Sequence, residues 1–144
     1  MDKIERIEQY VKSNREWHSR RIQFYAEEGE IAKSIVKALE GMEYELEMGS
    51  GIELKFKTEE EARLARGMVT ITVESIEKWE KTFNAFDTYK DEPEWRWEAK
   101  AKIDDMDLWI RIYPTTPKPG CVPRLQENES YRSKSWICEG GEGE

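Results

Sequence analysis

Histidine and cysteine are scarce in this chain of 144 residues, and their scarcity excludes several kinds of site. The sequence contains one histidine, His18, and two cysteines, Cys121 and Cys138. A structural zinc site needs a full tetrahedral set of such ligands, which one chain cannot supply here. A Ser-His-Asp arrangement is not expected either, because the only histidine lies in a stretch that reads as helix. Neither a P-loop nor a dinucleotide-binding G-x-G-x-x-G pattern is present, so we expect no catalytic residues, no metal site and no cofactor.

Long apolar runs and an excess of basic charge are also missing. No apolar run approaches the ~20 residues that span a bilayer, and residues 1–13 lack the apolar core of a signal peptide. We therefore expect a cytoplasmic protein that does not enter membranes, with free, buried thiols, although a disulfide between the two cysteines stays open. With 23 basic and 31 acidic residues the net charge is −8, which argues against direct binding of duplex nucleic acid. The acidity serves solubility or suits a basic protein partner.

Residues 2–40 read as one long helix. Apolar residues recur at heptad spacing in a seam with a polar centre, which runs Ile4, Val11, His18, Tyr25, Ala32, Leu39. An unbroken helix would be about 57 Å long at 1.5 Å per residue, so we expect part of it to pair with a second copy of the chain. The alternative is two helices that split near Gly29 and pack on the domain. This N-terminal helix, residues 1–41, would precede an α+β domain at 42–138 and a disordered acidic tail at 139–144.

Alternation predicts a β-hairpin over residues 44–56. Its apolar positions are Tyr44, Leu46, Met48, Ile52, Leu54 and Phe56, and charged residues lie between them on both sides of the turn Gly49-Ser50-Gly51. Such a hairpin has one buried and one charged face.

Two helices are expected after this hairpin. Thr58 and Glu61 form a capping-box pair that begins the first helix. We expect this helix to end near Gly67, with "VTITV" as a short strand or a linker. The second helix is predicted from an apolar stripe at Ile76, Trp79, Phe83 and Phe86.

Two further strands are predicted at residues 94–103 and 106–113, joined by a turn at Asp104-Asp105. On one face they place Trp95, Trp97, Ala99 and Ala101 beside Leu108, Ile110 and Ile112, which we take as core. A stiff proline loop, "PTTPKPGCVP", follows, and "SWIC" is expected as a final strand. The segments together predict an α+β fold: a long N-terminal helix, then an antiparallel sheet of four to five strands with two helices packed on one face.

The opposite face of the two strands holds the first candidate site. Alternation brings there Arg96, Glu98, Lys100 and Lys102 from one strand and Trp109, Arg111 and Tyr113 from the other. We select Arg96, Trp109, Arg111 and Tyr113 as binding residues, because aromatic rings beside arginines stack on bases and hold phosphates. The same groups anchor protein partners. Alternatively, the N-terminal helix or a second copy of the chain covers them.

The second candidate site lies on the N-terminal helix and comprises Trp17, His18, Arg20 and Arg21. Arginines in such a cluster fork to phosphate or carboxylate groups. A polar break that fixes the register of a coiled coil explains the same residues, and we favour it. The three aspartates around residue 105 lack the spacing of a calcium-binding loop, so a solvated turn is the better interpretation there.

The stretch "EPEWRWEAKAKIDDMDLWIRIYPTTPKPGC", followed by "SWIC", resembles a loose group of small bacteriophage-encoded accessory proteins. Those proteins combine a charged N-terminal helix with a tryptophan-rich hairpin, a proline run that ends in cysteine, and a second cysteine near the C-terminus. The resemblance covers the last third of the chain. It implies a phage gene whose product inhibits host defence by binding.

Four functions follow from these observations. We favour a non-enzymatic binding protein that interferes with host antiviral defence by sequestering a nucleotide-type signal. The first alternative is an acidic inhibitor that binds a host defence protein, either by mimicking nucleic acid or by plugging its site. The others are a virion structural or assembly protein and, least favoured, a hydrolase built from carboxylates.

Overall fold

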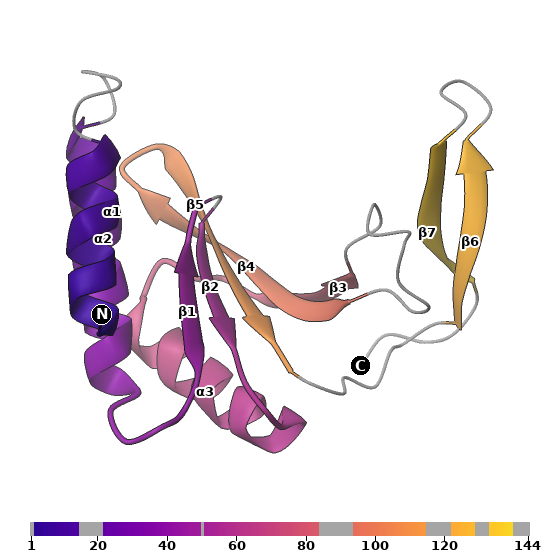
Figure 1. The fold of residues 1–144 in the computed structure, drawn as a ribbon, viewed down its shortest axis with the longest axis horizontal. Helices are drawn as coiled ribbons and strands as arrows, with labels where there is room; N and C mark the ends of the chain where they lie inside the picture. The colour runs from indigo at the N-terminus through magenta and orange to yellow at the C-terminus, as the bar shows by residue number, and fades with distance from the viewer. Residues whose placement is uncertain are drawn as a thin grey trace.

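In a computed structural model, the chain forms a pair of helices, a five-stranded sheet with a third helix, and a separate two-stranded sheet (Figure 1). The structure describes residues 2–14, 22–49, 51–83, 94–114, 122–128 and 133–139. In chain order the elements are α1 (Lys3–Asn14), α2 (Ile22–Ala38), β1 (Glu45–Met48), β2 (Ile52–Lys55), α3 (Glu59–Thr72), β3 (Trp79–Phe83), β4 (Trp95–Ile103), β5 (Met106–Tyr113), β6 (Val122–Asn128) and β7 (Ser133–Glu139). The predicted α+β class is confirmed.

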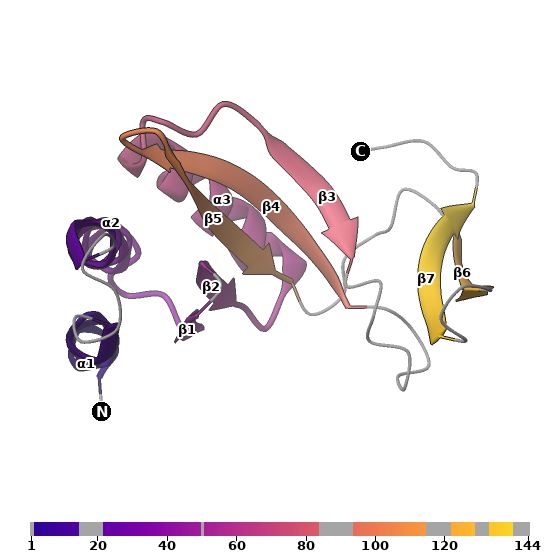
Figure 2. The same cartoon turned by 90° about the horizontal axis from the view of Figure 1, so that it is seen from above.

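The N-terminal region contains two helices, and the prediction of one long helix over residues 2–40 is wrong. Helices α1 and α2 lie side by side and run in opposite directions (Figures 1 and 2). The alternative break near Gly29 is wrong as well, because Gly29 lies inside α2, where a Cβ atom would approach the Cγ2 atom of Val11 to 2.5 Å. The missing side chain lets the helices come close. Of the described seam residues, Ala32 and Leu39 are buried and Ile4 is exposed. Because the two helices pair within one chain, the length argument for a second copy no longer holds.

The five-stranded sheet has the order β1-β2-β5-β4-β3. All neighbouring strands are antiparallel except β2 and β5, which pair in parallel, so the sheet is mixed and the antiparallel prediction needs this correction. A parallel pair requires a long connection, and here α3, β3 and β4 lie between the two strands in the sequence. The predicted hairpin over 44–56 is confirmed, with Leu46 opposite Leu54.

One face of the sheet packs against all three helices. The predicted core pairs are confirmed, since Trp97 lies opposite Ile112, Ala99 opposite Ile110, and Ala101 opposite Leu108. All six side chains are buried. The helices add Ile7, Ala32, Ile35, Ala62, Ala65 and Val69 to the same core, and Leu39 joins it directly after α2. The opposite face is therefore the one that carries the charged side chains of the strands.

Helix α3 begins as predicted and ends later than predicted. The Oγ1 atom of Thr58 accepts the backbone N–H of Glu61 at 3.1 Å, and its hydroxyl donates to the Glu61 carboxylate at 2.9 Å. The helix continues through Gly67 to Thr72, because a single exposed glycine costs a helix only about 1 kcal/mol. The expected turn at Gly67 is wrong.

The second predicted helix is also wrong, because its central residues form the edge strand β3. Trp79 pairs with Ala99, and Phe83 pairs with Trp95. Two apolar residues four positions apart share a face in a helix and also in a strand, so their spacing alone does not separate the two structures. Hydrogen bonding to β4 decides for the strand.

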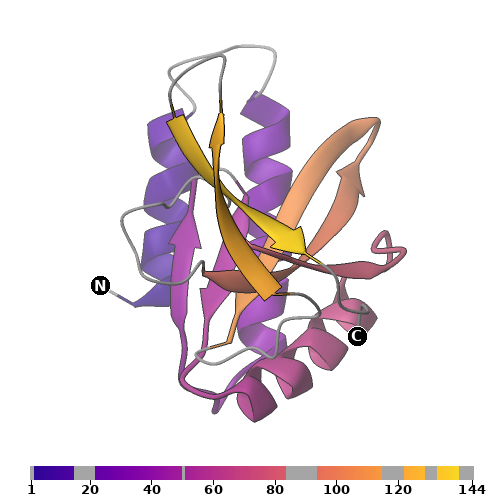
Figure 3. The same ribbon diagram turned by 90° about the vertical axis from the view of Figure 1, so that its right-hand side faces the viewer.

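The last two strands, β6 and β7, form a hairpin that stands apart from the five-stranded sheet (Figures 1 and 2). Seen from that side, the hairpin lies in front of the sheet (Figure 3). The predicted "SWIC" strand lies in β7, which belongs to this separate sheet. Strand β6 occupies residues 122–128, which were not predicted as strand. Glu139 ends β7 instead of beginning a tail. No helix in the described part of the chain is long and apolar enough to cross a membrane.

Candidate functional site

The candidate site lies on the outer face of the five-stranded sheet, the face that points away from the helices. Partners in the strand register share a face, and those on the outer face are Glu45, Glu47, Glu53, Lys55, Glu80, Thr82, Arg96, Glu98, Lys100, Lys102, Asp107, Trp109, Arg111 and Tyr113. The four residues selected from the sequence are thus brought together as predicted. Trp17, His18, Arg20 and Arg21 lie outside the described residues.

The two arginines of the outer face are engaged by glutamates. The Nε atom of Arg111 donates to Oε2 of Glu98 at 2.5 Å, and its Nη1 atom lies 3.6 Å from Oε2 of Glu53. The Nη2 atom of Arg96 lies 3.7 Å from the same Glu98 oxygen. These four side chains are only 13–20% exposed. Their charges therefore neutralise each other, and neither guanidinium presents the open fork that a phosphate would need.

Tyr113 is buried, a point that the sequence left open. Only 7% of the residue is exposed, and its hydroxyl accepts a hydrogen bond from Nη1 of Arg96 at 3.0 Å. Burial raises the pKa of the Tyr113 phenol, and the nearby Arg96 opposes this shift. The Nε atom of Arg96 also donates to Oγ1 of Thr82 at 3.3 Å. Tyr113 and Arg96 therefore form part of the packed sheet surface and are not available to stack on a ligand.

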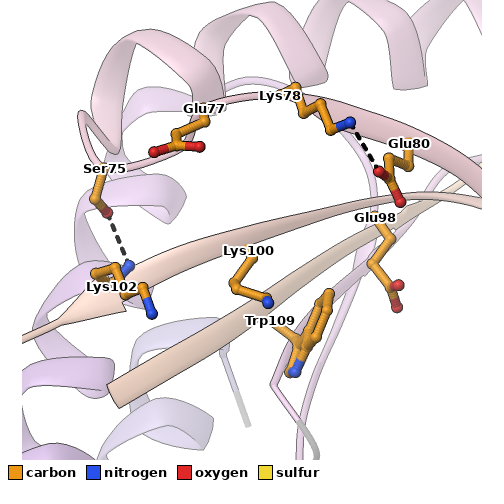
Figure 4. Close-up of a pocket in the computed structure, with 8 residues that line it drawn as sticks. All are labelled: Ser75, Glu77, Lys78, Glu80, Glu98, Lys100, Lys102 and Trp109. Carbon is orange, nitrogen blue, oxygen red and sulfur yellow. Dashed lines mark hydrogen bonds and ion pairs between the residues drawn. The ribbon is translucent and has the colours of Figure 1, made fainter. Parts of the chain in front are cut away.

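Trp109 is the aromatic residue of the outer face that borders a hollow. A groove of about 380 Å³ lies between β4 and the segment that enters β3. It is lined by Ser75, Glu77, Lys78, Glu80, Glu98, Lys100, Lys102 and Trp109 (Figure 4). The indole is partly exposed, and the Nζ atom of Lys100 lies 5.1 Å from the ring centroid.

Asp107 forms ion pairs with two lysines beside this groove. The Nζ atom of Lys100 lies 3.6 Å from Oδ2 of Asp107, and the Nζ atom of Lys102 pairs with Oδ1. The hydrogen bond from Lys102 is the main reason that the pKa of Asp107 is lowered. Both lysine side chains are about half exposed, at 47% and 52%. At this end of the groove, cationic charge exceeds anionic charge.

The opposite rim of the groove carries acidic groups. The Nζ atom of Lys78 lies 3.1 Å from Oε1 of Glu80, and Glu77 points from the same rim (Figure 4). The Oγ atom of Ser75 accepts the backbone N–H of Lys102 at 3.1 Å, which ties the rim to β4. The groove thus has one cationic end with an aromatic wall and one mixed rim.

Lys100 and Lys102 are the functional candidates that the selection from the sequence left out. Alternation along β4 already placed both on the outer face, so a signal for them existed. Alternation does not reveal that each arginine pairs with a glutamate. Because of this pairing, Lys100 and Lys102 are the more accessible cations of this part of the face. Among the described residues, no three histidine, cysteine, aspartate or glutamate side chains gather as metal ligands.

No family model matches the chain, and neither a curated protein nor a solved structure does. Function is therefore inferred from the geometry of the outer face and from the charge of the chain.

Proposed function

We propose that this is a non-enzymatic binding protein whose groove beside Trp109 holds a small molecule with an aromatic ring and a phosphate group, the chemical class of a nucleotide. The observation that carries the proposal is the convergence of one partly exposed indole and two ammonium groups that share a single carboxylate. Stacking of a base on an aromatic side chain contributes about 1–3 kcal/mol. The ammonium groups of Lys100 and Lys102 would bind the phosphate.

The distribution of charge supports this choice of face. Basic and acidic side chains nearly balance on the outer face, whereas the whole chain carries a net charge of −8. The acidic excess therefore lies elsewhere on the molecule. An anion approaching the outer face meets less repulsion than it would at most other places on this protein.

The role we propose is sequestration of a nucleotide signal inside a bacterial cell, in interference with antiviral defence. The resemblance of the tryptophan-rich hairpin and the following cysteine segment to phage accessory proteins supports this setting. Sequestration needs affinity and no chemical step, which agrees with a groove built from an indole, lysines and glutamates. Homo-oligomerisation is part of the same proposal, because sharing a ligand between copies would increase retention.

Calorimetric titration of the full chain with mononucleotides and cyclic dinucleotides tests the proposal. We expect saturable binding of at least one of them, and a loss of at least about tenfold in affinity, or ~1.4 kcal/mol, in Trp109→Leu and in the double variant Lys100→Gln/Lys102→Gln. Lys57→Gln is the matched control, because Lys57 is 81% exposed and pairs with Glu43 away from the groove. Equal losses in the control, or no binding at all, would refute the assignment. Conversion of the nucleotide during the titration would refute the non-enzymatic part.

A second candidate function is direct inhibition of a basic host protein. The observation that favours it is the net charge of −8 together with three successive glutamates in the first turn of α3, Glu59, Glu60 and Glu61. Association of this kind weakens steeply as salt screens the charges. A pull-down from bacterial lysate at low and high salt separates the two functions. Recovery of a nucleotide with the protein supports sequestration. Recovery of a basic protein at low salt, and its loss at high salt, supports direct inhibition.

A further inference from the structure

A second cleft lies where the helical pair meets the turn between β1 and β2 and the start of β5. Its volume is about 250 Å³. The side chains that matter are Tyr10 from α1, Phe24, Tyr25 and Glu28 from α2, and Asp107 and Trp109 from β5. The cleft touches the groove of the proposed function only through Trp109, which lines both.

Glu28 is the unusual member of this cleft. The residue is 2% exposed, and its Oε1 atom has no hydrogen-bond partner among the described residues. The hydroxyl of Tyr10 is its polar neighbour, but this hydroxyl donates to the carbonyl oxygen of Gly49 at 3.2 Å. A hydroxyl has one proton and cannot serve both acceptors. Buried polar atoms are almost always hydrogen bonded, so an unpartnered carboxylate oxygen on a residue that lines a cleft points to a missing donor.

Aromatic side chains line the same cleft as Glu28. The rings of Tyr10 and Tyr25 lie 5.9 Å apart at an angle of 82°, and those of Phe24 and Tyr25 lie 5.7 Å apart at the same angle. The faces of such rings attract cations, and aromatic cages are a common way to recognise ammonium groups.

We infer that this cleft binds an organic ammonium group, with the Glu28 carboxylate as its counter-charge and the rings of Tyr10, Tyr25 and Trp109 as its walls. A metal ion is a poorer occupant, because hard cations take many oxygen ligands and the described residues contain no cluster of three acidic ligands. A neutral apolar group would leave Oε1 without a donor.

This inference goes beyond the proposed function, because the ligand has the opposite charge and the cleft is a different one. An ammonium group comes from two sources, a free amine or a lysine side chain of a protein. Both sources present the same ammonium group to the cleft. Comparing a free alkylamine with a lysine peptide identifies the source.

NMR titration of the full chain with n-butylammonium tests the inference, and the neutral isostere n-butanol serves as ligand control. We expect saturable shifts with the amine and none with the alcohol. Glu28→Gln should weaken amine binding at least tenfold. Glu30→Gln is the matched control, because Glu30 lies on the same helix but is 77% exposed and pairs with Lys33 at 3.7 Å. Equal binding by wild type and Glu28→Gln, or by amine and alcohol, would overturn the inference.

A second variant and a change of pH keep the test independent of the folding of Glu28→Gln. Tyr25→Leu removes a ring and keeps the carboxylate, so it should weaken amine binding too; unchanged binding would count against the aromatic cage. Amine affinity should rise between pH 6 and 8 in wild type. Among the described residues, the other titratable groups that line the cleft are Tyr10, Tyr25 and Asp107, the last paired with two lysines of β4. Tyrosine and aspartate side chains ordinarily titrate outside this range. A flat pH profile would contradict the role of Glu28.

Two lysine peptides identify the source of the ammonium group. A short uncharged peptide with a single lysine is compared with its acetyl-lysine form. Tighter binding of the lysine peptide than of butylammonium supports a protein partner as the source. Binding equal to or weaker than that of butylammonium supports a free amine. Binding of the acetylated peptide as tight as that of the lysine peptide would overturn the inference, because acetylation removes the charge.

Discussion

Replacement of Glu28 by glutamine should make the protein more stable at neutral and alkaline pH. Glu28 lies in α2 with 2% of its surface exposed, and burial raises the pKa of its carboxyl group from 4.5 to about 7. The hydroxyl of Tyr10 opposes this shift but does not cancel it. Above about pH 7 the folded protein must therefore hold a buried carboxylate that water would solvate better in the unfolded chain.

The magnitude follows from the two pKa values. Each pH unit between 4.5 and about 7 corresponds to about 1.4 kcal/mol, so ionisation of Glu28 lowers the free energy of unfolding by about 3 kcal/mol. The folded-state pKa is the higher one. The stabilising effect of the protonated group is thus complete below pH 4.5 and is lost as pH rises through about 7. This loss is large, because the free energy of unfolding of a protein domain is only about 5–15 kcal/mol.

Urea unfolding at pH 4.5 and pH 8, without added amine, measures the effect. The difference in free energy of unfolding between Glu28→Gln and wild type should grow by about 3 kcal/mol from the lower to the higher pH. Other carboxyl groups titrate in both proteins and cancel in this difference. Glu30→Gln, which removes an exposed carboxylate from the same helix, should change the difference by less than about 1 kcal/mol. A pH-independent difference for Glu28→Gln would show that the carboxyl group is solvated in the folded protein and would refute this reasoning.

Three further predictions concern the fold. Gly29→Ala should destabilise the protein by about 1–3 kcal/mol in urea unfolding, because the new Cβ atom meets Val11 at 2.5 Å; Gly67→Ala in α3, where no heavy atom lies within 4 Å, should instead stabilise it by up to about 1 kcal/mol. The reasoning fails if both changes have the same sign. Thr58→Ala should cost about 1 kcal/mol by removing the N-cap of α3, and Thr58→Ser should restore most of it; equal stability of the two variants would exclude a capping role. Arg111→Met should cost about 2–4 kcal/mol, because in a partly buried cluster it removes the ion-pair partner of Glu53 and leaves Glu98 with Arg96 alone. A loss no larger than that of Lys57→Met would show that the cluster is solvated.

The sequence alone was sufficient where local chemistry decides the structure. Alternation of apolar and charged residues predicted the β1–β2 hairpin and both central strands, because side chains on a strand alternate between faces. The register then placed Trp97, Ala99 and Ala101 opposite the aliphatic residues of β5, as expected. The N-cap at Thr58 was equally readable, since it depends on atoms three residues apart. For the same reason, the outer-face location of Arg96, Trp109 and Arg111 was predicted correctly.

Tertiary structure decided everything that depends on partners distant in the sequence. Trp79 and Phe83 have a spacing that suits both a helix and a strand, and only pairing with β4 makes them an edge strand. The apolar spacing of the N-terminal region predicted helix, but it did not show that the chain folds back into two helices that pack closely at Gly29. The parallel pairing of β2 with β5 follows from the same non-local packing.

The candidate sites, too, were predicted in part from the sequence and in part determined by the tertiary structure. Residue type and alternation placed arginines, lysines and an indole on one face. They did not contain the information that Glu98 and Glu53 would take up the charge of Arg111, or that Glu28 would be buried with an unpaired oxygen among aromatic rings. Pairing and burial are properties of distances between side chains from different elements, and those distances exist only once the sheet and the helices have packed.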